Sequence, residues 1–330
     1  MKLLVVSKID PEALAALQST HDVVVEINPD EATLESLIAD RDVLIFRSGV
    51  EITRGALEAG RQLKLLLRAG SGLDNIDTDY IEQRGIRLQR VPGPGAQSVA
   101  ELTFALMLAV ARNVVSADAS MRAGRWLKSE LTGHMLSGKT LGVVGLGNIG
   151  TKVANMGSAW GMTVIGCVER PSSGRAAAFA ERDIELVDCD EVIARADFLT
   201  LHVPLKATNV GLIDDRALRR MKPSAFLVNI ARGGVVDEEA LLRALRDGRL
   251  AGAALDVHAT ERDGHRSALA DLPNVVLTPH LGASTVDSQR EIGREIIRIL
   301  ASLRSETGDP VPAGETTAFA ATALPSFQEV

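Results

Sequence analysis

The chain has 330 residues, with 36 Lys and Arg against 43 Asp and Glu, and a formal net charge of −7 at pH 7. A surface that binds nucleic acid normally needs a basic face, so this charge argues against that class of function. Only 3% of the residues are aromatic, which argues against base-stacking platforms and aromatic cages. The core must therefore be aliphatic, as in buried parallel strands and their covering helices, and the length predicts about two domains.

The two cysteines, Cys167 and Cys189, are too few for a disulfide framework and lack the CxxC spacing of a zinc or redox site. We therefore expect a reducing compartment and no metal site. The longest apolar run, 104–111, is too short to span a membrane, and the run near the N-terminus is too short for the core of a signal peptide. These features predict a soluble, cytoplasmic protein with no membrane partner.

Short β-branched runs alternate with helical stretches through the first part of the chain. Such alternation is typical of βαβ units around a parallel sheet, so this region is predicted to form a small doubly wound domain. The expected strands cover residues 3–6, 23–27, 43–46, 64–68 and 86–90, and the expected helices cover 11–19, 31–40 and 53–60.

A glycine-rich loop, RAGSGLDNID at 68–77, follows the fourth of these strands. Ligands of open α/β sheets bind beyond the carboxyl ends of the strands, and Gly70 and Gly72 would let backbone N–H groups approach an anion. A glycine-rich turn without a ligand explains the same residues equally well. The local sequence leaves both interpretations open.

The segment Ser98-Val99-Ala100-Glu101 fits a capping box that opens a helix over 101–112. That helix is apolar nearly all round, which is typical of a buried helix. The Pro- and Gly-rich stretch at 92–98 before it predicts a hinge and a first domain boundary.

The strongest motif is Gly145-x-Gly147-x-x-Gly150, placed directly after an expected strand at 140–144 and opening an expected helix at 148–160. This placement indicates a dinucleotide site. Gly145 permits the tight turn, Gly147 admits the pyrophosphate, and Gly150 lets helix and strand pack closely. The helix N-terminus attracts the phosphate charge.

The end of the next expected strand, 163–168, bears on the choice of coenzyme. Glu169 lies 19 residues beyond Gly150, near the place where an acid holds the ribose hydroxyls of NAD. Arg170 beside it could pair with the 2′-phosphate of NADP, or could be an ordinary surface residue. The sequence alone leaves NAD and NADP both open.

Further strands are expected at 198–203, 226–230, 253–257 and 275–279, which makes about six strands in this second sheet. The last helix, from 285 to about 303, is expected to return to the first domain. The tail after Ser305 has no clear periodicity, and we expect it to be disordered or to lie on a surface.

Three polar residues, Arg232, Glu261 and His280, each follow a predicted strand, and the carboxyl ends of parallel strands meet in one crevice. Each alone could be an ordinary surface or strand-end residue. Together they suit the oxidation of a 2-hydroxy acid: an imidazole takes the hydroxyl proton, a carboxylate orients the imidazole, and a guanidinium holds the substrate carboxylate.

These residues belong to segments that resemble a known family. The matching segments are RAGSGLDNID, SVAELTFALMLA, GKTLGVVGLGNIG, LHVPLKATNVGLID, NIARGGVVDEEAL, AALDV and LTPHLGAST. The chain resembles the D-isomer-specific 2-hydroxyacid dehydrogenases, above all the D-3-phosphoglycerate dehydrogenase branch. The resemblance implies two Rossmann-like doubly wound parallel-sheet domains with the active site in the cleft between them. It implies that residues 1–97 and 287–330 form the substrate-binding domain and that residues 98–286 form the dinucleotide-binding domain. It also implies that the oxidoreductase is a homodimer joined through the coenzyme domain.

The resemblance also implies roles for individual residues, with NAD as coenzyme and NADP as an alternative. The implied catalytic set is Arg232, Glu261 and His280. The coenzyme residues are Gly145, Gly147, Asn148, Ile149, Gly150, Glu169, Arg170, His202, Val203, Pro204, Thr208, Ile230, Ala231, Arg232, Asp256, His280 and Gly282. The substrate residues are Arg47, Ser48, Gly70, Ser71, Gly72, Arg232 and His280.

The chain departs from the family pattern at several positions. The family acid after the second strand aligns with Val168, one place before Glu169, and His258 stands where a Phe is usual. Pro92-Gly93-Pro94-Gly95 lacks the asparagine that relatives often have there. The chain is also too short for the regulatory domain that phosphoglycerate dehydrogenases often carry, so feedback control of that kind is not expected.

Arg47 and Ser48, at the end of the third strand, resemble a segment of phosphoglycerate dehydrogenases and could bind a phosphate or phosphonate on the substrate. The alternatives are a structural Arg there, and glyoxylate, hydroxypyruvate or another small 2-keto acid as substrate. A third possibility, from another class, is a coenzyme-sensing corepressor that binds partners without turnover. The Arg232, Glu261 and His280 set argues against that possibility.

Overall fold

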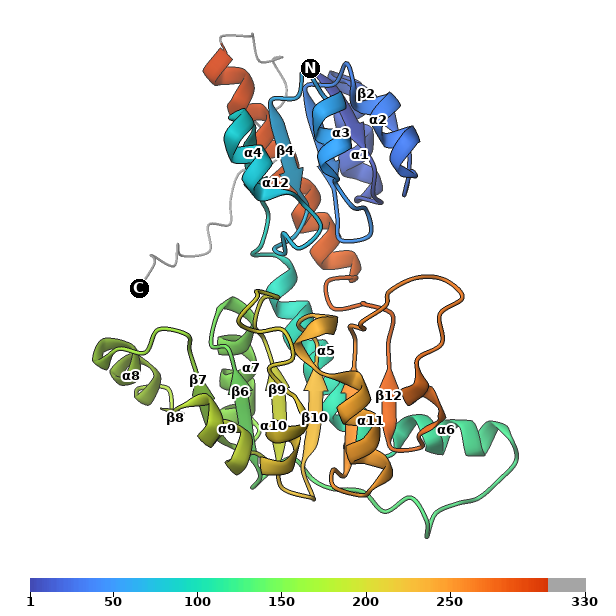
Figure 1. The fold of residues 1–330 in the computed structure, drawn as a ribbon, viewed down its shortest axis with the longest axis vertical. Helices are drawn as coiled ribbons and strands as arrows, with labels where there is room; N and C mark the ends of the chain where they lie inside the picture. Colours follow the sequence, from blue (N-terminus) through green and yellow to red (C-terminus); the bar gives the residue numbers. More distant parts are fainter. Residues whose placement is uncertain (308–330) are drawn as a thin grey trace. The chain divides into compact units, whose positions relative to one another are not determined.

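The structure, a computed structural model, describes residues 1–307, and the predicted tail beyond them lies outside the described residues. The chain forms two compact units (Figure 1). The first comprises Met1–Gly95 and the segment that begins at Thr285, and the second comprises Ala96–Ser284.

The sheet of the first unit is entirely parallel and has the strand order β2-β1-β3-β4-β5, which is the flavodoxin-like doubly wound order. Every strand lies within about two residues of its predicted position. The strands are β1 (Lys2–Val5), β2 (Asp22–Val25), β3 (Val43–Phe46), β4 (Leu65–Arg68) and β5 (Arg87–Arg90).

Helices cover both faces of this sheet. The helices are α1 (Pro11–Thr20), α2 (Glu31–Ile38), α3 (Arg54–Ala59), α4 (Thr78–Arg84) and α12 (Val286–Thr307). Side-chain oxygens of Asp or Thr cap the N-termini of α1 to α4, which satisfies backbone N–H groups that the helix leaves unpaired. On one face Ile292, Ile296 and Leu300 of α12 join Leu3 and Val5 of β1 in a single apolar cluster.

The sheet of the second unit has seven parallel strands in the order β12-β11-β10-β9-β6-β7-β8, where about six were predicted. The prediction missed β8 (Ile184–Leu186), a three-residue edge strand too short to show a period in the sequence. The remaining strands are β6 (Thr140–Val144), β7 (Thr163–Cys167), β9 (Phe198–Leu201), β10 (Phe226–Asn229), β11 (Gly252–Leu255) and β12 (Val275–Leu277).

Seven helices and two short 3₁₀ turns accompany this sheet in the sequence. They are α5 (Gly95–Ala111), α6 (Val114–Arg122), α7 (Asn148–Ala159), α8 (Ser173–Ala180), α9 (Cys189–Arg195), α10 (Asp215–Arg220) and α11 (Glu238–Arg246), with η1 (Gly233–Val235) and η2 (Ala268–Asp271). Apolar residues of α5 and α7 form one core cluster with the sheet, and those of α9, α10 and α11 form another. The two clusters make this unit doubly wound as well.

The capping box predicted at Ser98 is wrong, because α5 begins three residues earlier, at Gly95. Ser98 is buried inside the helix. The buried residues Ala96, Val99 and Ala100 continue the apolar face of the helix by one turn, so packing overrides the local capping signal. The prediction that this helix is largely buried is confirmed, since ten of its residues are buried.

No single helix within residues 1–307 is long and apolar enough to cross a membrane. Helices α5 and α6 meet the criteria of length and composition only as a pair, across a bend of 63°.

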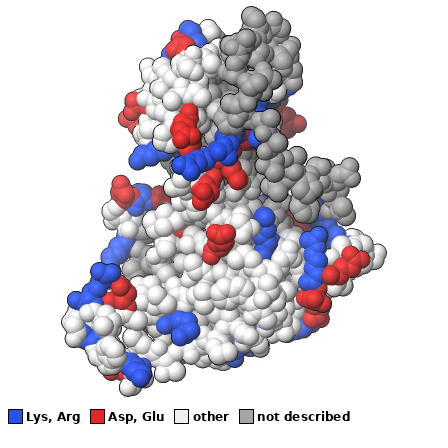
Figure 2. Space-filling model, turned by 180° about the vertical axis from the view of Figure 1, so that it is seen from behind, with Lys and Arg blue, Asp and Glu red and all other residues white. Residues whose placement is uncertain are grey.

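On the face of the molecule in Figure 2, Lys and Arg side chains lie scattered, and several stand beside Asp or Glu.

Candidate active site

The glycine motif joins β6 to α7 with the geometry that the spacing predicts. Gly145 has a φ of 97°, and a Cβ there would lie 2.6 Å from the carbonyl oxygen of His202. A Cβ on Gly150 would collide with the carbonyl oxygen of Gly145. Both positions therefore require glycine, for the turn and for the close approach of helix and strand.

Gly147 is the N-cap of α7 and supplies no side chain to the helix end. A Cβ on Gly147 would meet no atom within 4 Å, so space is open in front of the helix N-terminus. The first turn of α7 contains no acid, and its amides and dipole favour a bound phosphate. The residues therefore fit the pyrophosphate of a dinucleotide.

The other predicted coenzyme residues lie at the carboxyl ends of the same sheet. Asn148 and Ile149 begin α7, and His202, Val203, Pro204 and Thr208 follow β9. Ile230 and Ala231 follow β10. The ring of His202 bonds to Thr200 Oγ1 at 3.0 Å, and burial lowers the pKa of His202 to about 3, so this imidazole is neutral at pH 7.

Glu169 and Arg170 follow β7 and are exposed. The Glu169 carboxylate accepts a hydrogen bond from Lys206 Nζ at 2.8 Å. The hydrogen bond and charge of Lys206, with the nearby charge of Arg170, lower the pKa of Glu169. The acid of this segment is therefore ionised and already paired with a cation.

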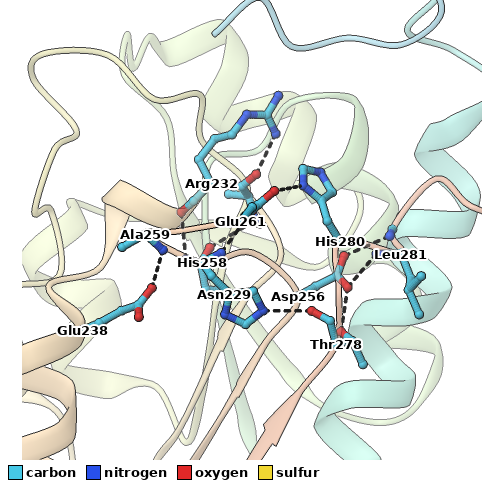
Figure 3. A network of polar contacts seen from close by, with 12 residues as sticks. Asn229, Arg232, Glu238, Asp256, His258, Ala259, Glu261, Thr278, His280 and Leu281 are labelled. Atoms are coloured by element: carbon cyan, nitrogen blue, oxygen red, sulfur yellow. Dashed lines mark hydrogen bonds and ion pairs between the residues drawn. The ribbon is translucent and has the colours of Figure 1, made fainter. Parts of the chain in front are cut away.

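The three residues predicted to be catalytic follow β10, β11 and β12, which are neighbours in the sheet. His280 Nδ1 lies 2.7 Å from Glu261 Oε2. Figure 3 shows the Glu261 carboxylate directed at the His280 ring, with the Arg232 side chain extending from the neighbouring loop. Burial alone would raise the pKa of Glu261, but the hydrogen bond and charge of His280, with the His258 N–H, outweigh it and lower that pKa.

The backbone of His280 has a φ of 54°, in the left-handed region that residues other than glycine rarely adopt. Asp256, which is fully buried, holds this segment. Its backbone carbonyl accepts from the N–H of His280 at 2.8 Å. Its carboxylate accepts from Thr278 Oγ1 at 2.6 Å, Leu281 N at 2.8 Å and Gly282 N at 2.9 Å. The predicted coenzyme residue Asp256 thus fixes the loop that carries His280.

The loop of Arg232 packs against the loop of Glu261. A Cβ on Gly233 would collide with the carbonyl oxygen of His258, so the two backbones touch there. Asn229 Nδ2 donates to the carbonyl oxygen of Arg232 at 2.9 Å, and an Arg232 guanidinium N–H donates to the carbonyl oxygen of Ala231 at 2.6 Å. These contacts place the guanidinium on the loop beside the imidazole and carboxylate.

Comparison with known proteins agrees with this geometry. Residues 104–282 match the family model for the NAD-binding domain of the D-isomer-specific 2-hydroxyacid dehydrogenases. The chain is 40% identical over 294 residues to a hydroxypyruvate reductase of Thermotoga maritima, which covers 88% of this chain and 94% of the relative. The chain belongs to the D-isomer-specific 2-hydroxyacid dehydrogenase family.

Two further relatives extend the comparison. A D-3-phosphoglycerate dehydrogenase of Methanocaldococcus jannaschii is 41% identical over 313 residues, which cover 94% of this chain but 59% of that enzyme. A crystal structure of an NADPH-dependent glyoxylate/hydroxypyruvate reductase from Sinorhizobium meliloti, bound to NADP and malonate, is 26% identical with a TM-score of 0.81. It covers 98% of this chain and 99% of the reductase. The predictions of this family, of its NAD(P)-dependent oxidoreductase chemistry and of two parallel-sheet α/β domains are confirmed.

The substrate residues predicted in the first unit of this dehydrogenase lie at the ends of adjacent strands, β3 and β4. Arg47 is partly buried, burial lowers its pKa, and its guanidinium has no hydrogen-bond partner within residues 1–307. Ser48 is exposed, and the backbone N–H groups of Ser71 and Gly72 donate to no acceptor of the described chain. Gly70 has a φ of 157°, and Arg68 Nε donates to the carbonyl oxygen of Gly72 at 2.9 Å.

Sequence reasoning missed several residues that hold this site of the dehydrogenase together. Glu238, the first residue of α11, accepts from the N–H of Ala259 at 2.6 Å and so anchors the loop of Glu261. Thr278 bonds to Asp256 through its hydroxyl, and its carbonyl oxygen lies 2.9 Å from His258 Nε2. His258, which stands where the family usually has a Phe, is therefore held by a hydrogen bond. Asn229, which donates to the carbonyl oxygen of Arg232, was also missed. The available signal was a polar residue at the end of an apolar strand, and the structure buries it.

Proposed function

We propose that this dehydrogenase transfers a hydride between a nicotinamide coenzyme and C2 of a small D-2-hydroxy acid or 2-keto acid. The catalytic residues in this proposal are Arg232, Glu261 and His280. The observation that carries it is the 2.7 Å hydrogen bond between Glu261 and His280, which lie on the loops after β11 and β12, while Arg232 lies on the loop after the adjacent strand β10.

Oxidation of a 2-hydroxy acid removes a hydride from C2 and a proton from the hydroxyl group. The coenzyme supplies the hydride chemistry when it is bound. His280 takes the hydroxyl proton through Nε2, because Nδ1 faces Glu261. In the reverse direction the same nitrogen gives the proton to the carbonyl oxygen. Glu261 orients the ring and stabilises the imidazolium by its charge.

Arg232 contributes a planar guanidinium, which binds the carboxylate and carbonyl oxygen of the substrate with two parallel hydrogen bonds. In the first unit, the amides of Ser71 and Gly72 are donors suited to a substrate carboxylate. A fixed set of donors of this kind lowers the barrier to hydride transfer by orienting the substrate and by stabilising its charge.

The guanidinium of Arg47 favours a substrate with a second anionic group. Desolvation of an unpaired cation is costly, and a phosphate or phosphonate on the far end of the substrate would compensate it. The phosphoglycerate-like substrate is therefore our first candidate. The second is glyoxylate or hydroxypyruvate, favoured by the similarity to a hydroxypyruvate reductase over nearly the whole length of that relative.

A reduction assay separates these candidates. Phosphohydroxypyruvate, hydroxypyruvate, glyoxylate and pyruvate are compared by kcat/KM at equal coenzyme concentration. A preference for the phosphorylated acid, lost in Arg47→Ala while pyruvate reduction persists, supports the first candidate. A preference for hydroxypyruvate or glyoxylate, unchanged in Arg47→Ala, supports the second. If none of the acids is reduced by a folded protein that binds coenzyme, the proposed enzymatic function is wrong.

We also propose a homodimer formed through the second unit. Large apolar side chains are exposed along α6 and the segment after it. Soluble monomers rarely expose several large apolar side chains in one region of the surface. The exposed side chains include Val115 (54% exposed), Met121 (56%), Trp126 (75%) and Met135 (68%).

The two cysteines are free thiols, in keeping with the reducing cytoplasm that we propose as the location.

A further inference from the structure

The loop that follows β7 lies beside the glycine motif. The N–H groups of Gly145 and Leu146 donate to the carbonyl oxygen of Cys167, the last residue of β7, at 3.1 and 3.3 Å. In dinucleotide folds the side chains just beyond this strand meet the ribose of the adenosine half. The residues from 168 to 175 therefore decide which adenosine ribose the unit accepts.

The first residue of this loop cannot bind a ribose hydroxyl. Val168 is partly buried and packs against the apolar cluster of α5, α7 and the sheet. It occupies the position of the acid that in NAD-binding folds accepts hydrogen bonds from the ribose. Position 168 thus lacks the carboxylate that favours the 2′-hydroxyl and excludes a 2′-phosphate by charge repulsion.

The one acid of the loop, Glu169, is paired elsewhere. Its carboxylate accepts from Lys206 Nζ at 2.8 Å, and Lys206 belongs to the loop after β9, which is separated from β7 by β6 in the sheet. Both side chains are exposed, 67% for Glu169 and 49% for Lys206, so the pair is weak and can rearrange. With Arg170 and Arg175 the group holds three cations against one carboxylate.

The remaining polar side chains of the loop can donate hydrogen bonds to a phosphate. Arg170 has no side-chain hydrogen bond within the described chain, and its carbonyl oxygen accepts from Arg175 at 3.4 Å, which folds Arg175 back over the loop. Ser172 caps α8 by accepting from the N–H of Arg175 at 3.3 Å, and the first turn of α8 contains no acid. A guanidinium beside a hydroxyl at a helix N-terminus is a favourable environment for a phosphate dianion.

We propose that this dehydrogenase prefers NADP(H), and that Arg170 binds the 2′-phosphate, with Arg175 and Lys206 adding charge around it. The inference rests on the proposed function in one respect only, that the second unit binds a nicotinamide coenzyme. It adds the class of coenzyme and the residues that select it. The phosphate that distinguishes NADP from NAD is the ligand of this loop.

Calorimetric titration without substrate tests the proposal on the intact protein. The ligands are NADPH against NADH, and 2′,5′-ADP against 5′-ADP, which isolate the 2′-phosphate. We expect the ligand with the 2′-phosphate to bind about 10- to 100-fold more tightly, the range of a charge-assisted hydrogen bond or two. Arg170→Ala should remove most of this preference and change NADH binding less than about 2-fold.

Two variants sharpen the test. Arg182→Ala removes an exposed arginine just after α8 and should leave the preference unchanged, which makes it the matched control for a change in net charge. Val168→Asp places an acid at the end of β7 and should weaken NADPH binding about 10-fold or more while NADH binding holds or improves. Equal binding of NADH and NADPH by the unmodified protein, or equal losses for both in Arg170→Ala, would overturn the proposal.

These outcomes are separate from those of the proposed function. A protein that reduces 2-keto acids but binds NADH as tightly as NADPH retains its function and refutes the coenzyme inference. A protein that binds NADPH selectively and reduces no 2-keto acid supports the coenzyme inference and refutes the function.

Discussion

Asp256→Asn tests whether the carboxylate of Asp256 holds the loop of His280. The side chain is fully buried and accepts three hydrogen bonds, from Thr278 Oγ1, Leu281 N and Gly282 N, at 2.6 to 2.9 Å. Asparagine keeps the shape of the side chain but replaces one acceptor oxygen with an amide donor. At least one buried donor then faces another donor and loses its partner.

The magnitude follows from these contacts. One buried donor without a partner costs about 1–3 kcal/mol, and the bonds that remain weaken because the acceptor is no longer charged. We expect the free energy of unfolding to fall by about 2–4 kcal/mol in total, a large fraction of the stability of an ordinary domain. His280, at a φ of 54°, loses part of the restraint on its backbone, so kcat should fall as well.

Urea unfolding of the coenzyme-free protein, followed by far-ultraviolet circular dichroism, measures the loss without any contribution from coenzyme binding. Asp271→Asn is the matched control, because Asp271 is an exposed acid of the same unit, paired with Arg266 at 2.6 Å on the surface. It should leave the unfolding midpoint unchanged. If Asp256→Asn also unfolds at the wild-type midpoint with an unchanged slope, the loop does not depend on this carboxylate and our reasoning is refuted.

Three other substitutions test the proposed roles. His280→Ala should lower kcat by about 10²–10⁴-fold while coenzyme still binds in a titration, and an unchanged kcat would remove His280 from the chemistry. Arg232→Lys should lower kcat/KM for 2-keto acids by about 10- to 100-fold, because lysine lacks the paired donors, and near-normal steady-state kinetics would exclude that role. Trp126→Glu should convert the proposed dimer to monomer in sedimentation velocity, whereas a persistent dimer would place the interface elsewhere.

Much of the fold could be predicted from the sequence because buried parallel strands are nearly continuous apolar runs. The strands β3 and β6 match their predicted ranges, and β10 differs by one residue. The missed strand β8 is short, lies at the sheet edge, and carries Glu185, which forms an ion pair with Arg195 at the surface. A strand of that kind has no periodic signal, because one solvated edge supplies too few buried positions.

The site could be predicted only in part. Strand-end position and chemistry singled out Glu261 and His280, but their hydrogen bond depends on β11 and β12 being neighbours, which the order of strands along the chain does not specify. Glu238 looks like an ordinary acid in the first turn of a helix, and its contact with Ala259 appears only when the chain has folded. Such supporting residues act through tertiary contacts and leave no local pattern in the sequence.

The return of α12 to the first unit has a consequence for the order of events during synthesis. Leu3 and Val5 of β1 share an apolar cluster with Ile292 and Ile296 of α12. These α12 residues are made only after the whole stretch of about 190 residues between Gly95 and Thr285. At roughly 5–20 residues per second, the ribosome needs about 10–40 s for that stretch. The second unit is contiguous and can fold as it emerges, whereas the cluster of Leu3, Val5 and Leu17 lacks its α12 residues until that helix has been made. The earliest part of the chain to be made is thus among the last to complete its core.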